Sequence, residues 1–317
     1  MDILNFLYCF DNNYNIQAFT SISSLLNNIN EKINLHVIHP NENIESLFPD
    51  LILKNNNINE INFYKFDNTN LQFPNVENSH VSEATYYRFY IEKYIPQRYK
   101  FLIYLDADIL TINNPLNEIK KTILLMKEND ERISVKTEFN INNHKIDEVF
   151  SRLPLSSKYF NAGVMIINYD KWINENTLVY LLRTMNYLGG KIKYWDQDIL
   201  NVVFDGKYLE MNQYLNFSLS TDKYNLPPLE KLTEKILFLH FSGNLKPWSI
   251  KGVFNKFSNF YQDNFRKLNS GDFHLITNWR RGSFFDLVKG IFTLKIIYVK
   301  KPFKFIYYSI KLILTKQ

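Results

Sequence analysis

The stretch that most limits how this chain can fold is an apolar run ending in two carboxylates, Phe101-Leu102-Ile103-Tyr104-Leu105-Asp106-Ala107-Asp108. Five large apolar residues in succession are typical of a strand buried on both faces, as in a parallel sheet. Asp106 and Asp108 are two residues apart, so on an extended chain their side chains point to the same side. Two such carboxylates repel each other and lose solvation, which a divalent cation relieves. The stretch indicates a metal site; the alternative is one capping and one solvated Asp.

Length and composition indicate a globular protein with either one large domain and an appendage or two domains. The chain has 317 residues, 45% of them hydrophobic and 22% charged, which is enough to bury a sizeable core. Strand-like runs alternate with helical spacing, and this predicts an α/β fold with a Rossmann-like, mostly parallel sheet and flanking helices. We expect the sheet within residues 1–250 and a helical region within residues 251–317.

The predicted elements can be placed along the chain from their apolar spacing. Strands are predicted at Ile3–Phe10, Ile33–His39, Ile61–Phe66, Phe101–Leu105, Glu131–Glu138, Val164–Asn168 and Lys235–Phe241. Helices are predicted near Ile16–Leu26, Ile44–Lys54, Ser82–Tyr94, Thr111–Lys127, Asp170–Leu182 and Tyr194–Phe204. The polar stretch Asn140–Ser157 is a candidate loop or lid. The turn after the first strand lacks the glycines of a dinucleotide fingerprint, which disfavours NAD as a ligand.

Two single residues and two short segments could contribute to a site, although they could also have a structural role. Arg88 lies in a predicted helix and would ordinarily be solvated. Small residues in Phe160–Gly163 precede a strand, as is needed where backbone approaches a ligand. The polar residues in Tyr194–Asp198 open a helix, where they often serve only as caps. His240 lies near the end of the last predicted strand.

The single cysteine points to a reducing compartment, and no signal peptide is expected. Cys9 lies in an apolar run and has no partner for an internal disulfide, so a buried inert thiol is expected. Asp2 and Asn5 interrupt the start of the chain, which argues against a signal peptide. No uncharged apolar run approaches the ~18–20 residues of a membrane-spanning helix.

Positive charge is concentrated in a C-terminal tail, which we define as residues 280–317. The tail holds nine Lys and Arg against one acid, a net charge of +8, whereas residues 1–279 carry −3. Its lysines are spread through aromatic and aliphatic residues, which favours helices lying on an anionic membrane. The alternatives are a helix pair packed on the body, or nucleic-acid contact, which ranks last because no reading motif accompanies the basic residues.

Taken together, six motifs in this order resemble glycosyltransferase family 8. They are Asp11–Tyr14, Thr85–Arg88, Tyr104–Asp108, Phe160–Gly163, Trp195–Asn201 and His240–Trp248. The branch most similar to this chain contains bacterial galactosyl- and glucosyltransferases that extend lipopolysaccharide or lipooligosaccharide. The resemblance covers residues 3–250. It implies a GT-A fold and an enzyme that transfers a hexose, with galactose or glucose favoured, from a UDP-sugar to a saccharide acceptor with retention.

The resemblance also implies the cofactor and the nucleotide site. Asp106, Asp108 and His240 would bind Mn²⁺, with Mg²⁺ as a possible substitute; an imidazole among carboxylates suits a transition metal. The positions that match UDP contacts are Cys9, Asp11, Asn13, Tyr14, Gly243 and Lys246. Tyr14 would stack on uracil, Gly243 would let backbone approach the phosphates, and Lys246 would pair with them.

Further positions match contacts to the two sugars. Donor-sugar contacts are implied for Arg88, Asn161, Ala162, Asp196 and Gln197. Gln197, with Asp196 beside it, would face the anomeric carbon; because an amide is a poor nucleophile, same-face attack is favoured over a covalent intermediate. Asp198 would orient this group or act as a cap. His80 and Tyr194 match acceptor positions, but residues 137–157 offer no counterpart for the family's acceptor-side acid.

Two other functions remain open from the sequence. A nucleotidyltransferase would share the sheet and metal carboxylates, but usually has a Gly-rich basic loop that Asp11–Tyr14 lacks. A noncatalytic membrane-bound protein that binds sugar nucleotides or glycans is the other. The leading hypothesis is a cytoplasmic enzyme bound peripherally to the inner face of the membrane, where it meets a lipid-linked acceptor, with no nucleic-acid partner.

Overall fold

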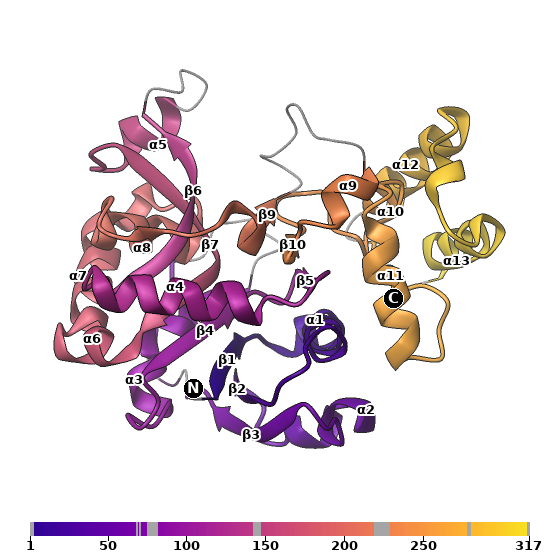
Figure 1. Cartoon of the computed structure of the whole chain (residues 1–317). Helices are drawn as coiled ribbons and strands as arrows, with labels where there is room; N and C mark the ends of the chain where they lie inside the picture. The colour runs from indigo at the N-terminus through magenta and orange to yellow at the C-terminus, as the bar shows by residue number, and fades with distance from the viewer. Residues whose placement is uncertain are drawn as a thin grey trace.

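The main sheet of the protein has seven strands, in the order β3-β2-β1-β4-β7-β6-β8 (Figure 1). The computed structural model describes residues 3–67, 69, 71–74, 82–141, 147–218, 229–277 and 280–315. The strands are β1 (Leu4–Cys9), β2 (Ile33–His39), β3 (Ile58–Lys65), β4 (Phe101–Leu105), β6 (Ile133–Asn140), β7 (Lys158–Asn168) and β8 (Leu209–Glu210). Every neighbouring pair is parallel except the two that involve β7, which runs against both β4 and β6. The predicted mostly parallel α/β sheet is confirmed.

Both faces of this sheet are covered, as the apolar runs predict. Successive side chains of a strand point to opposite faces, and Ile103 and Tyr104 accordingly lie in two different apolar cores. One core includes residues of α1 (Asn15–Asn28) and α4 (Leu116–Glu128). The other includes residues of η3 (Glu83–Tyr90), α3 (Ile91–Tyr94), α6 (Tyr169–Asn174), α7 (Thr177–Leu188) and α8 (Trp195–Phe204).

A second, small sheet carries the predicted last strand. It has the order β5-β10-β9, with β5 (Ile109–Thr111), β9 (Phe217–Ser218) and β10 (Phe238–His240). β10 runs antiparallel to β5, which follows β4 directly in the chain. This pairing carries the end of β10 back to the edge of the main sheet where β4 ends.

Several predicted elements differ in extent or type. The helix expected from Thr111 begins only at Leu116, and Pro115 occupies its N-cap. The helix expected at Ser82–Tyr94 is mostly a 3₁₀ helix, capped by the Ser82 hydroxyl. The expected loop at Asn140–Ser157 contains the helix α5 (Asp147–Arg152). The remaining short elements are η1 (Asn12–Tyr14), η2 (Ile44–Leu47), α2 (Asp50–Leu53), η4 (Gly189–Lys191), η5 (Gln213–Asn216) and α9 (Leu229–Thr233).

The C-terminal region is helical and packs on the rest of the chain at the side opposite α6 and α7 (Figure 1). It consists of α10 (Ile250–Val253), α11 (Ser258–Leu268), α12 (Arg280–Phe292), η6 (Lys295–Tyr298) and α13 (Pro302–Leu314). Leu287, Val299 and Phe305 of the tail form a buried core with Phe254 and Phe273. None of the described helices is long and apolar enough to cross a membrane.

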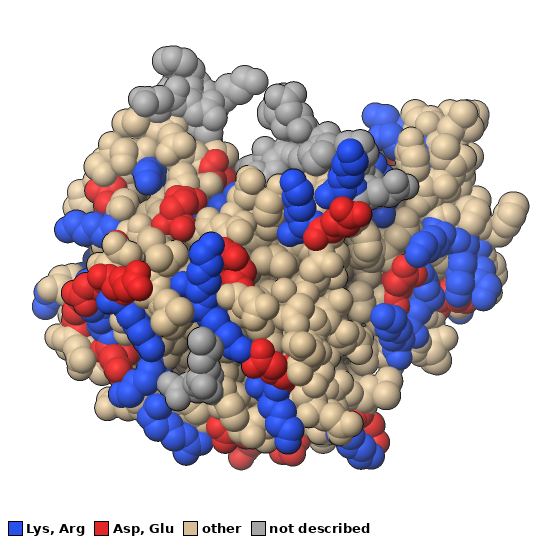
Figure 2. All heavy atoms as spheres, in the orientation of Figure 1, with Lys and Arg blue, Asp and Glu red and all other residues tan. Residues whose placement is uncertain are grey.

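The outer surface of the tail is partly apolar and partly charged. Phe284, Phe285, Phe292, Leu294, Ile297, Phe303, Tyr307 and Leu314 are exposed. Three of its lysines form ion pairs with acids of the preceding region: Lys300 with Asp263, and Lys301 and Lys304 with Asp272, each at 2.7 Å. Figure 2 shows basic and acidic side chains side by side on this lobe. The tail is therefore a helix pair packed on the body, and part of its outer surface is apolar. The packing is as expected for the helix pair, and the apolar part is as expected for helices that lie on a membrane.

Candidate active site

A pocket of about 400 Å³ lies at the edge of the main sheet where β1 and β4 end. The predicted site residues that line it are Cys9, Tyr14, Arg88, Asp106, Asp108, Asn161, Ala162, Tyr194, Asp196, Gln197, His240, Gly243 and Lys246. Asp11 and Asn13 do not line it; the Asp11 carboxylate instead accepts a hydrogen bond from the Asn13 backbone N–H at 2.9 Å and caps η1. His80 lies outside the described residues.

The reversed direction of β7 brings distant residues together in this pocket. Because β7 runs against β4, its first half lies beside the carboxyl end of β4, with Leu105 opposite Val164. The Asp106 backbone N–H donates to the Gly163 carbonyl at 2.9 Å. Asn161 and Ala162 thus lie within the strand, not ahead of it as the sequence predicted. Their placement next to the Asp-x-Asp pair is a consequence of this long-range pairing.

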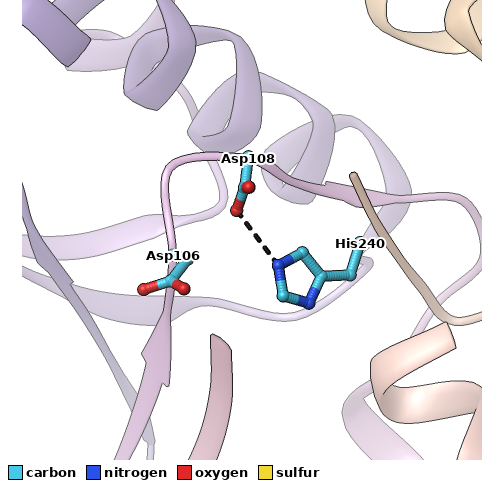
Figure 3. A group of neighbouring side chains, drawn as sticks. All are labelled: Asp106, Asp108 and His240. Atoms are coloured by element: carbon cyan, nitrogen blue, oxygen red, sulfur yellow. Dashed lines mark ion pairs between the residues drawn. The ribbon is translucent and has the colours of Figure 1, made fainter. Parts of the chain in front are cut away.

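Asp106, Asp108 and His240 form a cluster that fits a divalent cation. One possible ligand atom from each lies within 4.8 Å of the others. Asp108 and His240 point toward each other, with Asp106 beside them at the end of β4 (Figure 3). His240 Nε2 lies 3.4 Å from Asp108 Oδ1, a buried oxygen that accepts no hydrogen bond from the described residues. Two carboxylates and an imidazole are a suitable donor set for Mn²⁺.

The neighbours of His240 fix its orientation. Its Nδ1 lies 3.0 Å from the side-chain oxygen of Asn216, whose amide nitrogen donates to Asn161 Oδ1 at 2.9 Å. Since the Asn216 oxygen can only accept, His240 carries a proton on Nδ1, and Nε2 is the nitrogen that faces Asp108 and is placed to bind a metal. A Cβ at position 163 would lie 2.4 Å from His240 Cε1, so glycine there makes room for the ring.

Asp108 is held ionised by two basic partners. Burial acts to raise its pKa, but the adjacent charges of Lys246 and His240 outweigh that effect and hold the pKa of Asp108 well below its usual range. Lys246 forms an ion pair with Asp108 and also donates to the Phe241 carbonyl at 2.9 Å. Gly243, which lies between Phe241 and Lys246 in the chain, has φ of +70°, a conformation that favours glycine. The predicted basic group and glycine therefore lie next to the metal cluster.

Arg88 joins the metal cluster to the helix that carries Gln197. It is buried, contrary to the ordinary expectation for a helical arginine, and forms ion pairs with Asp106 at 3.0 Å and Asp196 at 2.8 Å. Its Nη1 donates to the Ala162 carbonyl at 2.6 Å. The Arg88 guanidinium lies over the Tyr104 ring, and its central carbon, Cζ, is 3.9 Å from the centroid of that ring. One cation thus fixes three predicted site residues.

The pocket carboxyl of Asp196 has a raised pKa. Burial raises it to about 6, although Arg88 and the Thr85 hydroxyl, which donates to Asp196, act in the opposite direction. Burial likewise raises the pKa of the Cys9 thiol far above its usual range. Cys9 is therefore an inert wall of the pocket, as its apolar surroundings predict.

The Gln197 amide, from α8, is held against β7. Its Oε1 accepts from the Ala162 backbone N–H at 3.0 Å, and its Nε2 donates to the Tyr159 hydroxyl at 3.1 Å. Trp195, two residues before Gln197, has φ of +47°, an uncommon backbone conformation for a residue with so large a side chain. Strained backbone of this kind is concentrated at functional sites.

Sequence reasoning missed several lining residues. Glu138, Phe139 and Tyr159 line the pocket, and the Asn161 amide donates to Glu138 at 3.4 Å. Glu138 is an acid within residues 137–157 that lines the pocket. It lies inside β6, whose sequence ISVKTEFN is not a continuous apolar run, so the rule that identified Asp106 would not have identified it. Asn216 carried no comparable signal in a chain rich in asparagine.

Comparison with known proteins identifies the family. The family model "Glycosyl transferase family 8" matches residues 5–252. A putative glycosyltransferase of Haemophilus influenzae is 30% identical over 255 residues, 78% of this chain and 74% of that protein. A lipopolysaccharide 1,2-glucosyltransferase of Escherichia coli is 28% identical over 258 residues, 78% and 74%. A lipopolysaccharide 1,3-galactosyltransferase of Salmonella typhimurium is 28% identical over 261 residues, 80% and 75%.

Solved structures confirm the fold. The galactosyltransferase LgtC, in complex with donor and acceptor sugar analogues, has a TM-score of 0.65 at 21% identity, over 88% of this chain and 100% of that chain. The glycosyltransferase GlyE of Streptococcus pneumoniae has a TM-score of 0.59 at 17% identity, over 93% and 64%. The architecture is that of GT-A glycosyltransferases. From the family match and the fold together, this chain belongs to glycosyl transferase family 8.

Proposed function

We propose that this protein is a retaining hexosyltransferase that uses a UDP-sugar and Mn²⁺. The observation that carries the proposal is the cluster of Asp106, Asp108 and His240 in a pocket that Gln197 also lines. The first three residues would bind the metal, which when present neutralises charge on a departing diphosphate. Lys246, beside Asp108, would pair with the same phosphates. Galactose or glucose is the favoured sugar, because the lipopolysaccharide relatives are named for these sugars.

The nucleotide would occupy the part of the pocket between β1 and β10. Tyr14 lines this part, with its ring 6.3 Å from that of Trp248 in an edge-on contact. A ring held by a second aromatic group is a suitable stacking surface for uracil. Asp11 and Asn13 would reach uridine only at the rim, since they do not line the pocket. We keep them as weaker candidates for hydrogen bonds to the nucleoside.

The donor sugar would lie between Arg88 and Gln197. Asp196 has a carboxylate that can accept hydrogen bonds from sugar hydroxyls, and Arg88 holds it in place. The Asn161 oxygen already accepts from the Gly163 N–H and the Asn216 amide, so Asn161 would donate to the sugar from its own amide nitrogen. The oxygen of Gln197 has a second lone pair that can face a developing oxocarbenium centre. Since an amide is a weak nucleophile, the acceptor hydroxyl would attack from the side that UDP leaves, with retention.

The acceptor would enter over Tyr194, which lines the pocket and is 42% exposed. Glu138 lines the pocket and would accept a hydrogen bond from an acceptor hydroxyl. The partly exposed Phe139 ring lies 5.9 Å from the buried ring of Tyr159. The exposed part of Phe139 is a suitable face for a pyranose. The relatives that act on lipopolysaccharide support a lipid-linked saccharide as acceptor.

The tail would hold the enzyme at the inner face of the cytoplasmic membrane. Its exposed aromatic and aliphatic side chains supply the apolar contact, and Arg281, Lys289, Lys295 and Lys311 supply positive charge. Lys300, Lys301 and Lys304 are engaged with acids of the body, so the charge free to meet anionic lipid is smaller than the net charge of the tail indicates.

The donor can be identified by a screen of UDP-sugars. Without acceptor, we expect slow Mn²⁺-dependent hydrolysis of UDP-galactose or UDP-glucose, and we expect the sugar first released to have the donor's α configuration by ¹H NMR. Release of the β anomer would contradict retention. Transfer of a nucleotidyl group instead of a sugar would favour the nucleotidyltransferase, which the family match disfavours. Binding of UDP-sugar without any turnover would favour a noncatalytic binding protein.

A further inference from the structure

A buried polar network outside the pocket connects α5 to the first turn of α8. The guanidinium of Arg152, the last residue of α5, lies 2.6 Å from Asp198 Oδ2 through Nη1 and 3.3 Å from Oδ1 through Nη2. The same Nη1 donates to the Lys191 carbonyl at 2.5 Å. Asp198 is fully buried, and Arg152 is its ion-pair partner. The two side chains meet as a bidentate pair, the arrangement that arginine makes best with a carboxylate.

Asp198 organises the groups around it as an acceptor. Oδ2 accepts from the backbone N–H groups of Lys193 at 2.8 Å and Tyr194 at 2.9 Å, which fixes the start of α8. Oδ1 accepts from the Tyr159 hydroxyl at 2.8 Å. An ionised carboxylate offers no proton of its own, so every neighbour must donate to it. The positive charge of Arg152 compensates the negative charge of the Asp198 carboxylate in this buried position.

The direction of the next hydrogen bonds follows from this charge. Tyr159 has one hydroxyl proton, and it is committed to Asp198, so its oxygen can only accept from Gln197 Nε2 at 3.1 Å. The other end of the amide, Oε1, accepts from the Ala162 backbone N–H at 3.0 Å. A flipped amide would place oxygen against oxygen and N–H against N–H. The network therefore permits one orientation of Gln197.

We propose that Arg152 is a positioning residue for Gln197, acting through Asp198 and Tyr159. It does not line the pocket, so it has no direct contact with a sugar there. The α5 segment is also held to this turn by the ion pair between Glu148 and Lys193. In this account α5, which the sequence alone suggested was a loop or lid, sets the geometry at the reacting carbon. The inference deepens the proposed function and rests on its placement of Gln197.

Kinetics test this role with Arg152→Met, which keeps much of the side-chain volume but removes the charge. The expected result is a fall in kcat of about 100-fold, since small misplacements of a catalytic group have effects of this size, with the KM for donor and the affinity for UDP unchanged. Arg152→Lys should recover part of the loss. Arg132→Met, which breaks a partly exposed pair with Glu175 away from the pocket, is the control and should leave kcat unchanged. A loss confined to donor KM would overturn the proposal.

A double mutant tests the path of the effect. If Arg152 acts through Tyr159, then Arg152→Met combined with Tyr159→Phe should lose no more activity than the worse single variant. Losses that multiply would mean that the two residues act independently, which contradicts the proposed path. If Arg152→Met does not fold, the pair Arg152→Lys and Tyr159→Phe supplies the same comparison with smaller changes in packing.

A measurement without turnover separates this inference from the proposed function. The Ala162 backbone N–H donates to Gln197, so its hydrogen exchange, followed by NMR on the full chain, reports whether Gln197 stays in place. Exchange should be at least about tenfold faster in Arg152→Met and Tyr159→Phe than in the wild type and Arg132→Met, because the bond is opened. Equal exchange in all four proteins would overturn the positioning role. Failure of every UDP-sugar to turn over would instead count against the proposed function alone.

Discussion

At the scale of single residues, the site depends on how closely a few atoms approach one another. Arg88 satisfies Asp106, Asp196 and the Ala162 carbonyl with one buried guanidinium. The burial of this residue was not predictable from its helical position, because the acids that surround it come from two distant segments. The type of residue at Asp106 and Asp108 was predictable, because two acids after a buried strand have few stable arrangements.

Gly163→Ala should displace His240. The added Cβ would lie 2.4 Å from Cε1 and 2.9 Å from Nδ1 of a ring that Asn216 holds in place. We expect Mn²⁺ affinity, measured by calorimetry in the presence of UDP, to fall roughly 10–100-fold, as when other groups that orient metal ligands are lost. Gly190→Ala is the matched control, since nothing lies within 4 Å of its added Cβ. Unchanged metal affinity in Gly163→Ala would argue against His240 as a ligand.

Gln197→Ala should slow transfer while UDP-sugar binding is kept. The amide is assigned to the donor sugar, and its hydrogen bonds are to Ala162 and Tyr159 rather than to the residues assigned to nucleotide and metal. A fall in kcat of about 10²–10³ is typical when a group that stabilises a transition-state charge is removed. Donor affinity measured by calorimetry should change little. Trapping of a covalent glycosyl adduct on another side chain, detected by mass spectrometry, would instead exclude same-face attack.

At the scale of elements, the strands of the main sheet were predictable except for the two-residue β8, and the direction of β7 was not predictable. Buried parallel strands appear as continuous apolar runs, and β2 begins and ends where its run does, at Ile33 and His39. The direction of β7 depends on pairing with β4 and β6, which local sequence does not encode. For the same reason Phe160–Gly163 was expected ahead of the strand, whereas it lies inside it.

Substitutions on the exposed face of the tail should affect membrane binding, and substitutions on its buried face should affect stability. Phe292 and Phe303 are 83% and 86% exposed, so the double variant Phe292→Ser, Phe303→Ser should lose binding to phosphatidylglycerol-containing vesicles and keep its melting temperature. Phe305 is fully buried against Phe254 and Phe273, so Phe305→Ala should reduce the free energy of unfolding by about 3–5 kcal/mol. Vesicle co-sedimentation and thermal melting of both variants measure the two effects.

These variants are sharper than a deletion from Arg280, which would uncover Phe254 and Phe273. Raised salt should weaken but not abolish vesicle binding by the unaltered chain, since only the electrostatic part is screened. If the unaltered chain ignores anionic vesicles, the exposed face has some other partner and the membrane proposal is wrong.

At the scale of the whole molecule, two buried histidines should make stability depend on pH. Burial lowers the pKa of His36 and of His274 from 6.5 to about 4. Below pH 6.5 the unfolded chain therefore binds protons that the folded chain does not, and the free energy of unfolding falls as pH drops toward 4. At pH 5 the loss is about 2 kcal/mol for each histidine.

His36→Phe should reduce the loss of stability between pH 7 and pH 5 by about 2 kcal/mol, measured by urea unfolding. The variant also loses the hydrogen bond between His36 and the Tyr64 hydroxyl. Tyr64→Phe removes that bond and leaves the titrating group, so it is the matched control and should keep the original slope. Equal slopes in His36→Phe and the unaltered chain would show that His36 is not held neutral by the fold.

In the proposed function, the cluster of Asp106, Asp108 and His240 binds the metal for transfer from a UDP-hexose. The most direct measurement is UDP release from UDP-galactose and UDP-glucose over a Mn²⁺ titration, for the unaltered chain and for Asp108→Asn. We predict release by the unaltered chain that saturates with Mn²⁺ and stops with chelator. Asp108→Asn, which keeps the shape but removes the charge, should be slower by about 10²–10³. Release that does not depend on metal, or full activity of Asp108→Asn at low Mn²⁺, would contradict the account.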